Sequence, residues 1–258
     1  MSASRRMPAV FVGHGSPMNA IEQNRYTQAW SALGAALPVP RAVLAVSAHW
    51  FVRGVAVTAN EQPRTIHDFY GFARELYRVR YEAPGDPALA RHVSEMLGTL
   101  DVALDESWGL DHGAWSVLLH LYPDADVPVV QFALDATKPA DLHWAIGAAL
   151  APLRDEGVLI LGSGNVVHNL AAADFGIGGG FDWAMRFDRH VRDALERGDA
   201  QALIRYDAHP DGALAVPTPE HYLPLLYVAA LRAPGEPVET IVDGLEAGAI
   251  SMRSVRIG

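Results

Sequence analysis

The segment that is most informative about the fold is Val158-Leu159-Ile160-Leu161-Gly162-Ser163-Gly164-Asn165-Val166-Val167-His168-Asn169. It opens with a continuous apolar run, which is typical of a strand buried on both faces of a sheet. The two glycines that follow allow a tight turn in which the backbone can approach a ligand closely. Because ligands bind at the carboxyl ends of strands in such sheets, the segment places His168 near a candidate site.

Similar short apolar runs recur along the chain and alternate with longer amphipathic stretches. The runs predict strands, and the stretches predict helices because their apolar residues recur at helical spacing. This alternation predicts an α/β fold in which helices cover the sheet, and no linker or repeat divides the chain. The expected strands are 9–12, 42–47, 55–59, 127–134 and 158–161, with closing strands at 241 and 251–257. The expected helices are 23–36, 87–100, 114–121, 139–153, 183–196 and 221–231.

Composition excludes several classes of function. The chain has 258 residues, with 30 acidic against 20 basic side chains and a formal net charge of −10. This balance argues against nucleic acid or an anionic membrane surface as partner, because both are bound by clustered Lys and Arg. No apolar run is long enough to span a membrane. The chain has no cysteine, which fits a cytoplasmic location and leaves His, Asp and Glu as the only strong metal ligands.

Histidines gather where the expected strands end. His14, His49 and His168 each lie in the turn after an expected strand, His221 begins an expected helix, and His112 directly precedes one. Neutral imidazole is a common ligand of zinc, iron, copper and nickel. A lone loop histidine is more often an ordinary hydrogen-bonded residue, but this set at strand ends favours a metal site. The other histidines on helices or in loops are interpreted as ordinary, namely those at 92, 120, 143, 190 and 209.

Competing motifs are weak. The Gly162-Ser163-Gly164 turn lacks the spacing of a nucleophile elbow. The Gly176–Gly180 stretch has the wrong spacing for a dinucleotide fingerprint, and no phosphate-binding loop is present. The sequence therefore leaves the histidines as the main candidates for chemistry.

The motifs around these histidines, taken together, resemble those of the 4,5-DOPA extradiol dioxygenase family. That family belongs to the class III, LigB-type, extradiol ring-cleavage dioxygenases. The resemblance runs from about Pro8 to Gly258. The motifs that carry it are Gly13-His14-Gly15-Ser16-Pro17-Met18-Asn19, Ser47-Ala48-His49-Trp50, Thr65-Ile66-His67-Asp68-Phe69, Asp111-His112-Gly113, Ser163-Gly164-Asn165-Val166-Val167-His168-Asn169 and Pro217-Thr218-Pro219-Glu220-His221-Tyr222-Leu223-Pro224.

The resemblance implies a fold and an activity. It implies a single α/β domain over residues 8–258, with a central mixed, mostly parallel sheet flanked by helices on both faces. Residues 1–7 are expected to be disordered or frayed. The implied reaction inserts both atoms of O2 into a catechol such as DOPA. It uses one non-haem metal, with Fe(II) expected for activity and Zn(II) also suited to the purified protein.

The resemblance also implies roles for particular residues. The metal ligands are expected to be His14, His49 and His221. His168 matches a further histidine that serves either as a ligand or as the acid–base residue, and His112 matches one beside the substrate and oxygen. The residues expected to bind or orient the substrate are His67, Asn165 and Asn169.

Three alternatives stay open at this point. Many class III enzymes use two His and one Glu, so the adjacent Glu220 and His221 are both candidates for the third ligand. A zinc-dependent hydrolase on the same cluster is the second alternative, because zinc lowers the pKa of a bound water. The third is a non-catalytic binding protein that keeps the fold, which a complete set of motif histidines disfavours.

Overall fold

The computed structural model describes residues 6–258, and its packed structure begins before residue 8. Met7 is buried, its N–H donates to the carbonyl of Arg154, and its own carbonyl accepts from the Arg154 side chain. Arg6 also donates to the carbonyl of Ala151. The expected frayed start is therefore wrong for residues 6 and 7, because these contacts anchor their backbone. The rest of that expectation, residues 1–5, lies outside the described residues.

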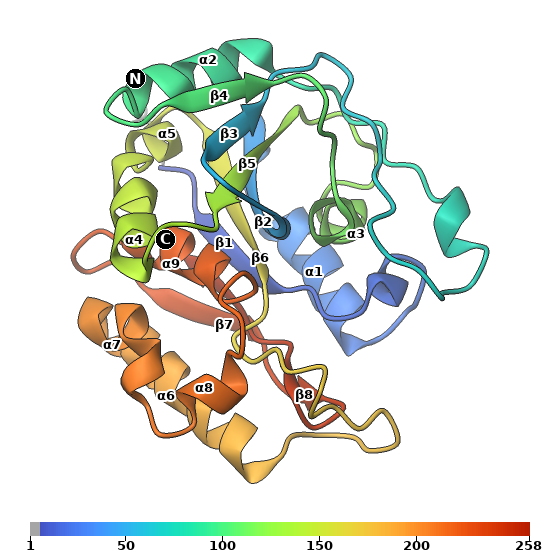
Figure 1. Ribbon diagram of the computed structural model, residues 1–258. Coiled ribbons are helices and arrows are strands. Elements are labelled where there is room, and N and C mark those ends of the chain that lie inside the picture. The colour runs from blue at the N-terminus through green and yellow to red at the C-terminus, as the bar shows by residue number, and fades with distance from the viewer. Residues whose placement is uncertain (1–5) are drawn as a thin grey trace.

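A single large β-sheet forms the centre of the molecule (Figure 1). Within residues 6–258 it has eight strands in the order β4-β3-β5-β2-β6-β1-β10-β7. Its strands β5, β2, β6 and β1 are parallel, whereas β3 runs antiparallel to β5 and β10 antiparallel to both β1 and β7. The mixed sheet with a parallel centre is thus confirmed. The strands are β1 (Ala9–Gly13), β2 (Ala42–Val52), β3 (Val55–Thr58), β4 (Val102–Asp105), β5 (Val129–Asp135), β6 (Val158–Gly164), β7 (Val238–Val242) and β10 (Ser254–Ile257).

Helices cover both faces of this sheet, as predicted. Alternate residues of each central strand point to opposite faces, so Leu44 and Ile160 enter one core and Val43 and Leu161 the other. The first core packs under α4 (Ala140–Ala149) and α9 (Leu223–Ala230), and the second under α1 (Arg25–Ala36) and α3 (His112–Leu121) on the opposite side (Figure 1). The remaining longer helices are α2 (Pro87–Met96) and α6 (Asp182–Arg197).

The structure corrects several expected boundaries. The strand expected to end at Ser47 continues as β2 to Val52, with a register shift against β5 between Val46 and Phe51. His49 therefore lies inside a bulged strand rather than in a turn after one. The helix expected over 139–153 breaks before α5 (Pro152–Asp155), because proline has no N–H to continue the helical ladder.

Several short elements were not expected, and the strand expected over 251–257 is divided, with Ser251 in β9 and only Ser254–Ile257 in β10. The strand β4 lies at an edge of the sheet, with Ala103 and Leu104 exposed. The strands β8 (Leu245–Glu246) and β9 (Ile250–Ser251) form a separate ribbon. The short helices are α7 (Ala200–Ile204), α8 (Gly212–Ala215) and the 3-10 turns η1 (Pro17–Ala20), η2 (Leu76–Arg78) and η3 (Tyr206–Ala208). No helix within residues 6–258 combines the length and apolar character needed to cross a membrane.

Candidate metal centre

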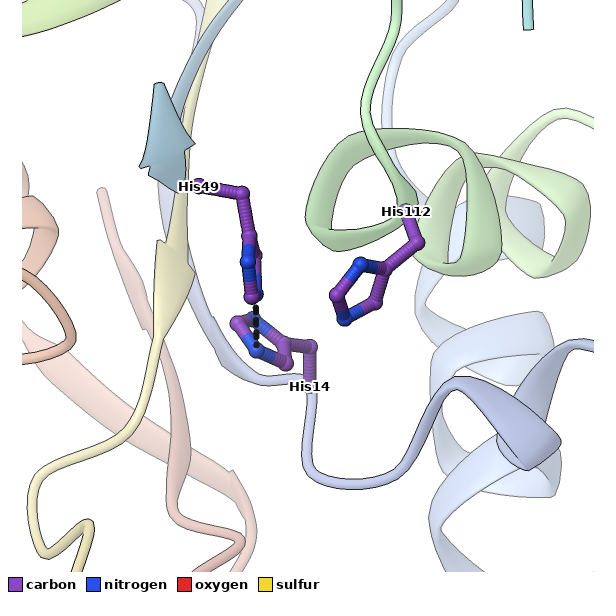
Figure 2. A group of neighbouring side chains, drawn as sticks. All are labelled: His14, His49 and His112. Carbon is purple, nitrogen blue, oxygen red and sulfur yellow. Dashed lines mark hydrogen bonds between the residues drawn. The ribbon is translucent and has the colours of Figure 1, made fainter. Parts of the chain in front are cut away.

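Histidines from distant parts of the chain converge at the carboxyl end of the parallel strands. His14 directly follows β1, His49 lies in β2, and His112 is the first residue of α3 (Figure 2). The ring centroid of His49 lies 5.1 Å from that of His14 and 3.9 Å from that of His112. His221, just before α9, lies 5.4 Å from His14, and its ring stacks on that of His168 at 3.5 Å. The structure thus brings together all five histidines expected at the site.

Close approach of the backbone makes this convergence feasible. A side chain at Gly164 would collide with the carbonyl oxygen of His221, and the N–H of Asn165 donates to that same oxygen at 2.8 Å. Gly15, which follows His14, has a φ of +59°, a conformation that L side chains rarely adopt. The glycines on both sides of the cluster therefore let its loops come together.

A serine orients the ring of His14. The Nδ1 of His14 lies 2.9 Å from Oγ of Ser163, and that hydroxyl donates to the carbonyl of Gly113 at 2.5 Å. Because the hydroxyl proton is used in this way, Ser163 accepts from an Nδ1–H of His14. The unprotonated Nε2 of His14 then points away from Ser163, and it lies 3.2 Å from Nε2 of His49 (Figure 2).

Carboxylates lie on the Nδ1 side of the other rings. Oδ2 of Asp68 lies 3.3 Å from Nδ1 of His49 and 3.0 Å from Nδ1 of His112. Oε1 of Glu220 lies 3.2 Å from Nδ1 of His221 and also accepts from the Thr218 hydroxyl at 2.7 Å. Glu220 therefore acts in this structure as a hydrogen-bond acceptor for His221.

Burial keeps four of the clustered imidazoles, those of His14, His49, His168 and His221, neutral. It lowers the pKa of His14 and of His221 well below the ordinary value, and neighbouring imidazoles add to the effect. Burial, reinforced by His112, lowers the pKa of His49 to about 3, and burial lowers the pKa of His168 to about 4. Since only neutral imidazole has a free lone pair, these rings are available as metal ligands at neutral pH.

The carboxyl groups beside the cluster differ in their pKa. Burial alone would raise the pKa of Asp68, but hydrogen bonds from His112 and the nearby imidazoles lower it below the usual range. Burial, together with the charge of Asp68, raises the pKa of Asp111 to about 6. Asp111 accepts from Ser47 at 2.6 Å and from Gln131, and it caps the N-terminus of α3. Asp68 therefore keeps its charge beside the rings to a lower pH than Asp111 does.

The histidines line a cavity of about 380 Å³. Its other walls are largely apolar, and no Asp, Glu, Lys or Arg is among the lining residues that the structure describes. Phe175 and Leu170 remain 79% and 58% exposed, so they form the mouth rather than the floor. The residues other than histidine that line the cavity are Gly15, Ser16, Pro17, Phe69, Phe72, Leu170, Phe175 and Ile250.

The residues expected to bind substrate lie outside this lining. The side-chain amide of Asn165 donates to the carbonyl of Ser251, and that of Asn169 donates to the carbonyl of Leu214. The ring of His67 contacts the carbonyl of Val79 at 3.2 Å and packs near Trp115. In this structure the three side chains hold loops beside the cavity, and their contact with a substrate stays a prediction.

The donor set fits a metal ion. The ligand nitrogens of His14, His49 and His112 lie within 4.8 Å of one another, and so do the ligand atoms of His168, Glu220 and His221. Several neutral imidazoles, with orienting acceptors on their far sides, are a donor set that suits Fe(II) or Zn(II). Sequence reasoning assigned no role to Asp68 or Ser163, although both lie within motifs that it quoted. The only local feature that could have pointed to a role for either residue is that each lies in the same motif as a histidine.

Comparison with known proteins agrees with this chemistry. A family model described as the catalytic LigB subunit of aromatic ring-opening dioxygenase matches residues 8–251. The chain is 51% identical to the 4,5-DOPA dioxygenase extradiol of Escherichia coli (strain K12), over 99% of this chain and 96% of that protein. It is 35% identical to the protein of the same name from Beta vulgaris, over 95% of this chain and 94% of the relative.

A solved structure shares the fold as well. The crystal structure of an uncharacterized protein from Escherichia coli K12 matches with a TM-score of 0.87 and 47% identity, covering 98% of this chain and 100% of that chain. The resemblance seen in the sequence motifs is therefore confirmed. Membership in this family argues against both alternatives, the zinc-dependent hydrolase and the non-catalytic binding protein. The chain belongs to the LigB family, the catalytic subunits of aromatic ring-opening dioxygenases.

Proposed function

We propose that this enzyme opens the ring of a catechol such as DOPA beside its two hydroxyl groups, with insertion of both atoms of O2. The observation that carries the proposal is the cluster of neutral histidines at the base of a cavity with aromatic walls. The names of the relatives from Escherichia coli and Beta vulgaris support DOPA as the first substrate to test. The lack of cysteine fits a reducing cytoplasm as the compartment where the enzyme works.

We assign His14, His49 and His221 as the ligands of one non-haem metal ion, and Fe(II) as the active metal. His221 is preferred to Glu220 because the His221 ring lines the cavity, whereas Glu220 accepts from its Nδ1. Zn(II) suits the same nitrogens as an occupant of purified protein, with His168 as a fourth ligand in that state. A bound Fe(II) ion would supply open positions at which the two catechol oxygens and O2 meet.

Proton transfer falls to the histidines that are not assigned as ligands. A catechol loses protons when it chelates a metal, and a neutral imidazole within reach of its hydroxyls accepts one. His168 lines the cavity with its ring stacked on His221, so we assign it the acid–base role. We assign His112, whose ring lies 3.9 Å from that of His49 and lines the cavity, to hydrogen-bond substrate or oxygen through its Nε2.

The apolar walls explain how an aromatic substrate is held. Phe69, Phe72 and Phe175 come from two separate loops and line the same cavity, so they offer aromatic surfaces to a substrate ring. Because the lining has no cationic or anionic side chain, a charged substituent on the ring is best accommodated toward the open mouth. Asn165 and Asn169 then act on substrate through the loop that they hold.

Oxygen uptake tests the proposal directly. Metal-free protein is loaded anaerobically with Fe(II) or with Zn(II) and then mixed with DOPA, caffeate or unsubstituted catechol. We expect the Fe(II) enzyme to consume O2 and to form a yellow ring-opened product, and the Zn(II) enzyme to do neither. Turnover without O2, or with Zn(II) alone, would instead favour hydrolysis and overturn the proposal.

A further inference from the structure

The carboxylate of Asp68 stands between two histidines that have different proposed roles. Its Oδ2 lies 3.3 Å from Nδ1 of His49, the assigned ligand, and 3.0 Å from Nδ1 of His112, which faces the substrate cavity. Its Oδ1 accepts the backbone N–H of His112 at 2.9 Å. Asp68 therefore accepts hydrogen bonds from the ring and the backbone N–H of His112, and the same Oδ2 lies in ion-pair distance of the His49 ring.

The surroundings of Asp68 favour an ionised acceptor. An ionised carboxylate has acceptor oxygens only, so it satisfies both N–H groups of His112 without a competing donor. Asp68 also lies at the N-terminus of the ten-residue helix α3, whose positive end stabilises a negative charge. The charge of Asp68 also favours a protonated Nδ1 in the His49 ring, 3.3 Å away.

We propose that Asp68 is a positioning residue that fixes His112 in the tautomer protonated at Nδ1 and favours the same tautomer of His49 when that ring binds the metal. Each ring then presents an unprotonated Nε2 to the cavity, where His49 binds the metal and His112 accepts from substrate. Nε2 of His49 is hydrogen-bonded to Nε2 of His14 at 3.2 Å, so this edge of the His49 ring is the one turned to the cluster (Figure 2). The part of this inference that concerns the metal rests on the proposed function, whereas the tautomer of His112 does not.

The isosteric variant Asp68→Asn separates orientation from packing. An amide has a single acceptor oxygen. If that oxygen keeps the backbone N–H of His112, the NH2 group faces both Nδ1 atoms and favours the opposite tautomer in each ring. If the amide turns over, its NH2 opposes the backbone N–H of α3. Either arrangement removes part of the alignment without changing the volume of the side chain.

Two measurements test the inference. Nitrogen-15 NMR of the histidine rings in metal-free protein reports which nitrogen carries the proton. We expect Nδ1–H for His112 in the wild type and a switch to Nε2–H in Asp68→Asn. Competition with a chelating dye then measures Zn(II) affinity, which we expect to fall about 10–100-fold in the variant, the usual effect of losing such an acceptor.

Asp105→Asn is the matched control. Asp105 also accepts several bonds in a turn, from Ser107 and from the N–H of Trp108, but none from an imidazole. We expect this variant to keep the wild-type Zn(II) affinity and histidine tautomers.

The outcomes separate this inference from the proposed function. An Nε2–H tautomer of His112 in the wild type would overturn the inference even if Asp68→Asn failed to fold. Unchanged Zn(II) affinity and unchanged tautomers in a folded Asp68→Asn would also overturn it, while leaving wild-type oxygen uptake intact. The expected tautomer switch in a protein that never consumes O2 would instead reject the function and keep the role of Asp68.

Discussion

The Nδ1 of His14 lies 2.9 Å from Oγ of Ser163, and the Ser163 hydroxyl donates to the carbonyl of Gly113. This chain of bonds leaves Oγ as an acceptor and turns Nε2 of His14 toward the other histidines. We expect Ser163→Ala to lower metal affinity about 10-fold, because it removes the partner that orients a ligand. Zn(II) competition measures the loss. Ser116→Ala is the control, since its buried hydroxyl has no hydrogen-bond partner in the described structure, and an equal effect of both variants would refute the orienting role.

Substitutions of His221 and Glu220 can show which of these adjacent residues is the third metal ligand. We expect His221→Ala to strip the metal, because it removes a nitrogen of the cluster, whereas Glu220→Gln should retain most of it. The glutamine keeps an oxygen that can accept from Nδ1 of His221. Metal content after dialysis, measured by atomic emission, checks both variants. The reverse pattern would make Glu220 the ligand and the site a two-histidine, one-carboxylate triad.

Ligation and proton transfer can be separated at His168. We expect His168→Ala to keep most of its iron and to lose roughly 10²–10⁴-fold in turnover, the usual effect of a positioned acid or base. Added imidazole should restore part of the rate. His92→Ala, a surface variant whose ring pairs with Glu156, should behave as wild type. Loss of iron from a folded His168→Ala protein would show that His168 is an essential ligand instead.

The mouth of the cavity should contribute to substrate affinity. Phe175 lines the cavity although it is 79% exposed, whereas Tyr70 is 91% exposed and is absent from the lining. We expect Phe175→Ala to raise KM for DOPA about 3–10-fold with little change in kcat, the effect of losing an aromatic contact of about 0.5–1.5 kcal/mol. Steady-state oxygen uptake measures both constants. An equal rise of KM in Tyr70→Ala would argue against a specific contact at Phe175.

A buried histidine outside the site should make stability depend on pH. His143 accepts from the Tyr227 hydroxyl at 3.0 Å and donates to the carbonyl of Asp135 at 3.2 Å, and burial lowers its pKa. The imidazole therefore binds a proton near pH 6.5 in the unfolded chain but only at lower pH in the folded protein. The contribution of His143 to the free energy of unfolding is thus complete above about pH 6.5 and decreases below it. Urea unfolding of metal-free protein at pH 7 and pH 5 should show a smaller loss for His143→Gln than for the wild type. Equal losses would show that His143 is not part of the pH dependence.

Local patterns in the sequence were sufficient for the centre of the fold. The apolar runs at β1 and β6 predicted buried strands because a strand covered on both faces needs no polar alternation. The histidine-bearing turns after them predicted a cluster, since parallel strands end at the same edge of the sheet. Edge elements such as β4 were missed because exposure at Ala103 and Leu104 removes the apolar signal.

Residue types and their local spacing were enough to predict the α/β class, the motif histidines and the absence of any thiolate ligand. Only the folded structure shows that His49 lies in a bulged strand and that Asp68 lies between His49 and His112. It also brings Phe69 and Phe175, from loops far apart in the chain, to one cavity. The difference arises from separation along the chain. Strand and helix patterns arise from neighbours a few residues apart, whereas a hydrogen bond or cavity wall between distant loops depends on where the folded sheet brings each loop.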